Sequence, residues 1–463
     1  WQNIRNINYF MTHYQSVQAA EADVNIYVAE MRFFRALEYF NKIQLLGDVP
    51  WLEVDLNVDS EELYGPKMKR NQVFQKIIED LDFAIQWLPE AGSEEANRLN
   101  KDIARHVKAR FCLNEGTHYK YHDELEYASE AEKWLQMAAT ESDKLITSGR
   151  YEIYNTGHPQ EDYFNMYRID DKSDLKEAVL YVDYKTNIRE HNMAAAGREA
   201  GCGFSKSFVE SFLCSDGLPI SLSNKYLGDE TMRKETANRD PRLKQLILTN
   251  DFPTNVTDDL KDSTFVVNED EFITQHCFTG YRPIKGFNPI YSQALYMKSS
   301  FDGIAYRYAE TLLINAEAKA ELNTITNADL DRTVNQLRDR VGMPHLTVNV
   351  GFTDPKWPDW GYSLSPVLQE IRRERCIELA GEGFRFNDLK RWKAGKLLNN
   401  VLTYVGKRKP DGNLAIVYPN YTNPDLSYQA GKSRTWEDKM YLYPIPTGEL
   451  QRNPQLLPQN PGW

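Results

Sequence analysis

The sequence lacks three features that would each point to a particular class of protein: cysteine pairs, long apolar runs and an excess of basic charge. Its five cysteines are an odd number without a C-x-x-C pair, so they predict neither a disulfide framework nor a zinc site. Cys202 and Cys214 could pair, but the sequence alone does not decide this. No stretch approaches the roughly 18 apolar residues that a bilayer-spanning helix needs.

The charge balance argues against nucleic acid as a partner. The net charge is -12 and the isoelectric point is near 5.3. A phosphate backbone requires a basic surface on the protein that binds it, and this composition does not provide one.

Catalytic motifs are also missing. The chain has no G-x-S-x-G elbow, no phosphate-binding loop and no H-E-x-x-H pair. His118 and His122 are spaced to share one helix face, but no nearby carboxylate completes a metal site, and we expect two exposed histidines. Two carboxylates facing a cleft could still form a glycosidase site among the 67 acidic residues, yet nothing points to such a pair. We therefore predict a protein that is not an enzyme and has no cofactor.

Helical periodicity runs through the first 150 residues. Apolar residues recur every three or four positions, which predicts a helix beginning near Trp1 and further helices over 24–46, 71–88, 100–119 and 129–147. Short breaks separate these helices, so the pattern favours stacked hairpins of the tetratricopeptide kind. We predict a mainly α fold with these hairpins as its scaffold.

The rest of the chain changes character three times. Residues 151–300 are rich in loops, with a strand expected over 178–182, and form a large, partly β insertion. Helices are expected again over 304–322 and 330–341, followed by a loop over 348–362 and a helical pair over 367–398. After Asn400 the chain should be extended. This predicts four regions: 1–150, 151–300, 301–400 and 401–463.

The helical pair over 367–398 carries charge on a face that should be buried. Leu368, Ile371, Arg375 and Leu379 fall on one helix face. A buried guanidinium costs several kcal/mol unless carboxylates pair with it. We therefore expect a structural network of ion pairs here, rather than a catalytic acid pair.

This region also carries a family signature. The segments 371–375, 378–379, 382–386, 388–389 and 391–392 read IRRER, EL, EGFRF, DL and RW. Together they closely resemble the C-terminal signature of the SusD/RagB family of nutrient-binding lipoproteins of the Gram-negative outer membrane. Further segments resemble the family along most of the chain, among them 47–50, 239–243, 443–446 and 459–462.

The resemblance implies a function. It implies a SusD-like fold and a surface-exposed, lipid-anchored protein that captures an oligosaccharide. The cargo would pass to a SusC-like, TonB-dependent β-barrel transporter of the outer membrane. It also implies a secretion signal and a lipidated cysteine upstream of Trp1. Two alternatives stay open: an oligopeptide as the cargo, or a helical-repeat scaffold that binds only protein.

Aromatic side chains on loops are the candidate ligand contacts. The chain is 12% aromatic, with 27 Tyr and 9 Trp, and flat rings with a polar tip suit the stacking of sugar rings. Trp357 and Trp360 flank Pro358 in a stiff loop, so they either form a preorganised platform or anchor the loop onto the helices. The predicted ligand contacts are Trp51, Tyr64, Tyr281, Tyr291, Trp357 and Trp360.

Overall fold

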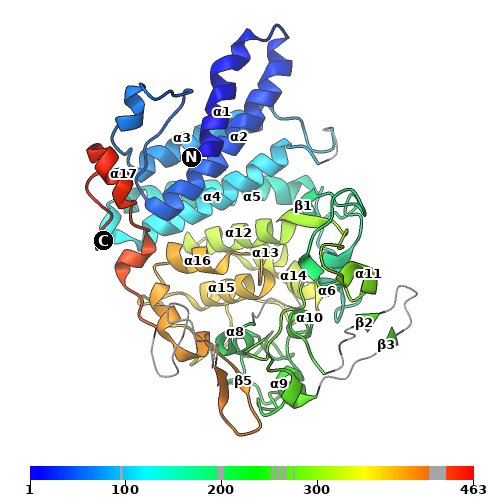
Figure 1. Ribbon diagram of the computed structural model, residues 1–463. Helices are drawn as coiled ribbons and strands as arrows, with labels where there is room; N and C mark the ends of the chain where they lie inside the picture. The colour runs from blue at the N-terminus through cyan, green and yellow to red at the C-terminus, as the bar shows by residue number, and fades with distance from the viewer. Residues whose placement is uncertain are drawn as a thin grey trace. The chain divides into compact units, whose positions relative to one another are not determined.

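The chain forms two compact units. Figure 1 shows the computed structural model, which describes residues 1–93, 97–194, 203–250, 252, 255–256, 262–263, 268–274, 277–416 and 434–463. The first unit comprises residues 1–147, 390–395 and 436–463, and the second comprises residues 148–389 and 396–435. The finer division into four regions stays a prediction. Cys202, and with it the possible Cys202–Cys214 pair, lies outside the described residues.

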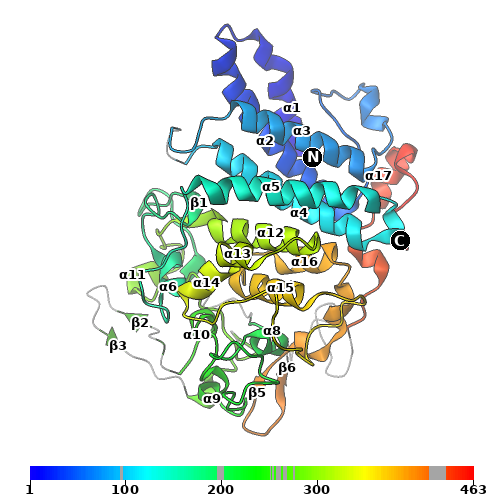
Figure 2. The same cartoon turned by 180° about the vertical axis from the view of Figure 1, so that it is seen from behind.

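Five long helices build the first unit, close to where their periodicity placed them. They are α1 (Gln2–His13), α2 (Glu21–Leu46), α3 (Arg70–Trp87), α4 (Lys101–Tyr121) and α5 (Ala131–Ser148). Helix α2 packs against α1 and α3, and α3 packs against α4, as Figure 2 shows from behind. Helix α4 lies close to α5 because it has no side chain at Gly116, where an added Cβ would lie 2.9 Å from Leu135 Cγ.

The C-terminal segment 436–463 belongs to this first unit, although it is last in the sequence. Tyr443 N donates to the carbonyl of Leu45 at 2.8 Å, and Lys67 Nζ donates to the carbonyl of Pro458 at 2.7 Å. The expectation of an extended tail was wrong for residues 447–452, which form the short helix α17 (Thr447–Arg452). It ends at Arg452, and its C-cap Asn453 precedes a proline, which cannot donate to the helix.

Short elements dominate the second unit. The predicted strand over 178–182 is confirmed as β1, and the predicted pair over 367–398 is confirmed as α15 and α16. Helices α12 and α15 pack together, and α14 contacts both. The elements are α6 (Asp162–Asn165), β1 (Ala178–Val182), α8 (Lys206–Ser211), α9 (Met232–Thr236), α10 (Arg242–Leu246), β2 (Asn255–Val256), β3 (Asp262–Ser263), α11 (Tyr291–Ala294), β4 (Gly303–Arg307), α12 (Tyr308–Glu321), α13 (Asn327–Asp331), α14 (Val334–Arg340), α15 (Pro366–Glu378), α16 (Arg385–Arg391), β5 (Val405–Arg408) and β6 (Leu414–Ile416).

Two predicted helices of this unit differ from the structure. The helix predicted over 304–322 begins at Tyr308, because residues 303–307 form β4, which pairs antiparallel with β1. The helix predicted over 330–341 is divided into α13 and α14, with Thr333 in a non-helical conformation between them. In both places pairing or turn geometry overrides the local apolar period.

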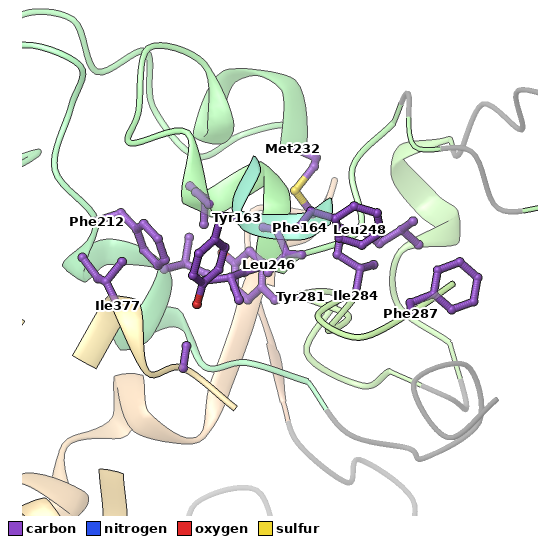
Figure 3. Packing of buried hydrophobic residues seen from close by; sticks show 14 of the residues in the cluster. Tyr163, Phe164, Phe212, Met232, Leu246, Leu248, Tyr281, Ile284, Phe287 and Ile377 are labelled. Atoms are coloured by element: carbon purple, nitrogen blue, oxygen red, sulfur yellow. The ribbon is translucent and has the colours of Figure 1, made fainter. Parts of the chain in front are cut away.

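The loop-rich part of the second unit has a hydrophobic core of its own. Figure 3 shows Tyr163, Leu246 and Tyr281 gathered within this cluster, and all three are 0% exposed. Residues from α6, α8, α10 and the 272–301 segment meet Ile377 of α15 there. Loops that share a packed core hold their surface side chains in defined places. Among the described residues, no helix is long and apolar enough to cross a membrane.

Candidate functional site

The charged signature on α15 is buried, as predicted. Glu378 is 0% exposed and accepts from Arg307 Nη1 and Arg340 Nη2, each at 2.6 Å, and from Arg242 Nη1 at 3.0 Å. Burial by itself would raise the pKa of Glu378, but Arg340, Arg307 and Arg242 hold it well below its usual range. The carboxylate therefore stays ionised, and its oxygens accept hydrogen bonds from three arginines. Such an arrangement is typical of a structural network of ion pairs.

Arg375 is part of a second buried group of charges. Its side chain is 4% exposed, and its Nε donates to Asp388 Oδ2 at 2.9 Å. Glu317 Oε2 lies 3.8 Å from the same nitrogen. The prediction of a buried arginine on this helix face is confirmed.

The two histidines are not exposed, contrary to the sequence-based expectation. His118 is 7% exposed and His122 is 2% exposed, because the segment that starts at Lys390 covers this end of α4. His122 Nε2 donates to the Lys390 carbonyl at 2.8 Å, and His122 Nδ1 lies 2.8 Å from Glu124 Oε1. Nowhere in the described part of the chain do three or more His, Cys, Asp or Glu side chains gather as metal ligands.

Trp357 and Trp360 both attach their loop to α15. Trp357 Nε1 donates to Glu370 Oε1 at 2.7 Å, and Trp360 Nε1 donates to Gln369 Oε1 at 2.6 Å. Trp360 is 5% exposed, whereas Trp357 is partly buried. This geometry favours the alternative in which the two indoles anchor the loop. A ligand contact for either residue stays a prediction.

Tyr281 is the most deeply buried of the predicted ligand contacts. It is 0% exposed, and its hydroxyl donates to the Glu235 carboxylate, whose oxygens lie 2.8 and 2.9 Å away. Burial, together with the neighbouring Glu235 charge, raises the pKa of Tyr281 well above its usual value. Its role as a ligand contact stays a prediction, and its ring has no surface available for a ligand in this structure.

The two predicted contacts in the first unit differ in exposure. The Trp51 ring is partly buried against Tyr39, with ring centroids 4.0 Å apart. Tyr64 is 50% exposed at the end of a 3-10 turn in the same connection between α2 and α3. Of the two, Tyr64 presents the more accessible ring.

Tyr291 is one of several exposed apolar side chains on two segments that are hydrogen-bonded to each other; we call these side chains the tyrosine patch. It combines two tyrosines with aliphatic and methionine side chains, all of which are exposed, and Tyr291 is the first residue of α11. The members are Ile188 (77% exposed), Met193 (52%), Tyr291 (57%), Leu295 (41%), Tyr296 (74%) and Met297 (45%). Contiguous exposed apolar side chains commonly mark binding surfaces.

Hydrogen bonds hold the two segments of the tyrosine patch together. His191 N donates to the Ser299 carbonyl at 2.8 Å, and Ser299 N donates to the His191 carbonyl at 3.1 Å. Met297 N donates to Asn192 Oδ1 at 3.0 Å. The patch is therefore positioned before any ligand arrives, which lowers the entropic cost of binding.

Two buried charged residues, Lys172 and Asp302, are hydrogen-bonded to each other through backbone groups. Asp302 accepts from the backbone N–H of Tyr184 at 2.8 Å and of Lys172 at 3.0 Å. Lys172 is 1% exposed and donates from Nζ to the carbonyl of Ile169 at 2.6 Å. Burial lowers the pKa of Lys172 to about 8.

Sequence reasoning found Tyr291 but missed most of the patch. The other members give no periodic signal, since Ile188 stands alone among polar residues and Leu295 and Met297 belong to one short apolar run. Only the pairing of 191 with 299, more than 100 positions apart in the chain, brings them together. The one sequence feature that could have indicated this binding surface is the presence of apolar residues in an irregular, otherwise polar segment.

Comparisons with known proteins agree on one family. A sequence model of the SusD family matches residues 145–463. The chain is 25% identical over 456 residues to SusD-like protein P2 of Formosa agariphila, an alignment that covers 96% of this chain and 75% of that protein.

Two solved structures from Bacteroides fragilis share the fold. One is a SusD-like protein, 24% identical, with a TM-score of 0.73 over 99% of this chain and 84% of that chain. The other is described as a SusD-like carbohydrate binding protein and is 22% identical. Its TM-score is 0.70 over 98% of this chain and 84% of that chain.

Proposed function

Because this chain belongs to the SusD family, we propose that it captures an oligosaccharide at the bacterial cell surface for uptake. Proteins of this family bind their ligands and do not catalyse a reaction on them. A structural relative is described as carbohydrate binding, which supports a glycan as the ligand class.

The tyrosine patch is the observation that carries this proposal. Tyr291 and Tyr296 are 57% and 74% exposed on segments that are already fixed by hydrogen bonds. A tyrosine ring offers a flat apolar face to the C–H groups of a sugar ring, and its hydroxyl can bond to the sugar hydroxyls. Trp51 and Tyr64 stay proposed as further ligand contacts.

Binding measurements on tyrosine variants test this role. A glycan array would first identify a bound oligosaccharide, and calorimetry would then compare the wild-type protein with Tyr291→Ala and Tyr296→Ala. Each substitution should weaken binding by about 1–3 kcal/mol, by analogy with the stacking of bases on aromatic rings. The melting temperature should hardly change, because both rings are largely exposed.

Tyr443→Ala is the matched control, since Tyr443 is a 52% exposed tyrosine in the first unit. The Tyr443→Ala variant should bind the oligosaccharide with the same affinity as the wild-type protein. Unchanged affinity in both patch variants would contradict the assignment of the site. An array without any bound glycan, combined with binding of oligopeptides, would instead support the peptide alternative.

The proposal includes a transport partner and an anchor. We propose that the bound glycan passes to a SusC-like, TonB-dependent β-barrel in the outer membrane, and that a lipid anchor holds this protein there. Affinity purification from native membranes in a gentle detergent should recover a large β-barrel protein. Recovery of this chain alone would contradict the transporter role and favour a scaffold that binds other proteins.

A further inference from the structure

Two basic residues, Lys185 and Arg189, are paired through their backbones across a tight turn beside the tyrosine patch. Lys185 N donates to the Arg189 carbonyl, and Arg189 N donates to the Lys185 carbonyl, both at 2.9 Å. This reciprocal bonding defines a hydrogen-bonded antiparallel pair. Directly opposed residues of such a pair project from the backbone to the same face, so the Cβ atoms of Lys185 and Arg189 leave the turn on one side.

The protein does not neutralise either cation. Both side chains are exposed, and in the described ranges neither forms an ion pair with a carboxylate. The nearest acidic residue in the chain, Glu190, is already used, since it accepts from Lys298 Nζ at 3.0 Å and from Asn187 N at 3.2 Å. Asp183 is exposed and likewise forms no ion pair with a described residue.

The position of Arg189 is set by an aromatic ring. Its Cζ lies 4.9 Å from the centroid of the Tyr184 ring, which also contacts His191 edge to face at 4.5 Å. A cation–π contact uses the face of the guanidinium and leaves its N–H donors free. Like charges placed opposite each other cost stability in a paired ribbon, a cost that an anionic ligand would remove.

We propose that Lys185 and Arg189 form an anion clamp that selects oligosaccharides bearing carboxylate or sulfate groups. This inference rests on the proposed function and specifies its ligand class. The same turn carries the exposed Ile188 of the tyrosine patch, and the Glu190–Lys298 pair joins it to the segment of Tyr296. A saccharide that lies on the tyrosines and extends over Ile188 would bring its anionic substituents to the turn.

The two cations of the turn can attract an anionic saccharide although the net charge of the whole chain is -12. At physiological ionic strength, charges farther than about 8 Å apart are largely screened. The distant acidic residues therefore repel an anionic saccharide little, while two cations in direct contact attract it strongly. Guanidinium donors also match the geometry of carboxylate and sulfate oxygens.

An array of paired oligosaccharides tests the proposal on the full chain. Each pair has one backbone and differs only in charge: a uronate against its methyl ester, or a sulfated saccharide against its desulfated form. We expect the bound glycans to be anionic, with at least about tenfold weaker binding of the neutral member. Comparison of the uronate pairs with the sulfated pairs shows whether the protein prefers carboxylate or sulfate groups.

Two variants connect this selectivity to the clamp. Lys185→Gln and Arg189→Gln should each lower affinity for the anionic member about tenfold and leave affinity for the neutral member unchanged. Affinity of the wild-type protein should also fall as salt rises. Lys244→Gln on α10 removes the same charge from another exposed position and should change neither affinity.

The outcomes separate this inference from the proposed function. Equal or tighter binding of neutral glycans would overturn the clamp and leave glycan capture intact. Unchanged affinity of both clamp variants for an anionic glycan would also overturn it. Absence of binding to every saccharide on the array would overturn both proposals together.

Discussion

Arg375 shows how strongly a single buried charge depends on its partners. Its Nε lies 2.9 Å from Asp388 Oδ2 and 3.8 Å from Glu317 Oε2. Asp388 and Glu317 are 4% and 0% exposed, so water cannot replace the guanidinium if it is removed. Such pairs contribute little over a well-packed apolar substitute, but removing one member leaves the other charge buried.

We predict that Arg375→Leu destabilises the protein by about 3–5 kcal/mol, because it removes the guanidinium that donates to the buried Asp388 carboxylate. Chemical denaturation at neutral pH would measure the change. Arg5→Leu is the control, since Arg5 is exposed on α1 and should change stability by less than about 0.5 kcal/mol. Equal stabilities of the two variants would show that Asp388 finds another partner.

At the scale of elements, the loop over 348–365 is tightly connected to α15, the helix that follows it. The indole N–H groups of Trp357 and Trp360 donate to Glu370 and Gln369 on that helix. Arg372 of the same helix lies 4.8 Å from the Trp360 ring centroid. The two tryptophans therefore join an irregular segment to a packed one.

We predict that the double variant Trp357→Ala, Trp360→Ala loses at least about 3 kcal/mol of stability, the usual minimum for truncating a buried tryptophan. Its affinity for the native ligand, measured where the protein remains folded, should change little. The platform alternative predicts the reverse result: binding falls by about 1–3 kcal/mol and the melting temperature stays constant. Calorimetry and thermal melting of the same sample distinguish the two.

At the scale of the whole molecule, buried lysines make stability depend on alkaline pH. Burial lowers the pKa of Lys172, Lys285 and Lys390 to about 8 each. In the unfolded chain these amines keep their protons up to about pH 10. Between pH 8 and 10 the unfolded state therefore binds more protons than the native state, and stability rises with pH over that range.

We predict that each of these lysines increases the free energy of unfolding by roughly 1–3 kcal/mol from pH 8 to pH 10, so that their contributions add. Above pH 10 the free energy of unfolding should fall, because burial raises the pKa of Tyr163 and Tyr167 well above 10 and keeps them protonated in the native state only. Urea titrations at several pH values would measure this profile. A Lys172→Met variant should show a smaller rise, and an equal rise would contradict the assignment.

The sequence by itself determined the features that depend on neighbours along the chain. Apolar spacing placed α2, α3 and α15 within a few residues of their observed bounds, because helix periodicity is a local property. The same spacing placed Arg375 on a buried face. The signature around it also identified the family that the comparisons confirm.

Only the tertiary structure decided which loop side chains are accessible. Tyr281 and Tyr291 lie ten residues apart in one loop-rich segment, yet the first is 0% exposed and the second 57%. The difference arises from a distant partner, since the Tyr281 hydroxyl bonds to Glu235 inside the core. Likewise, Lys185 and Arg189 became a candidate site only once their backbone pairing was known. Burial in irregular regions depends on contacts between distant parts of the chain, which no local period encodes.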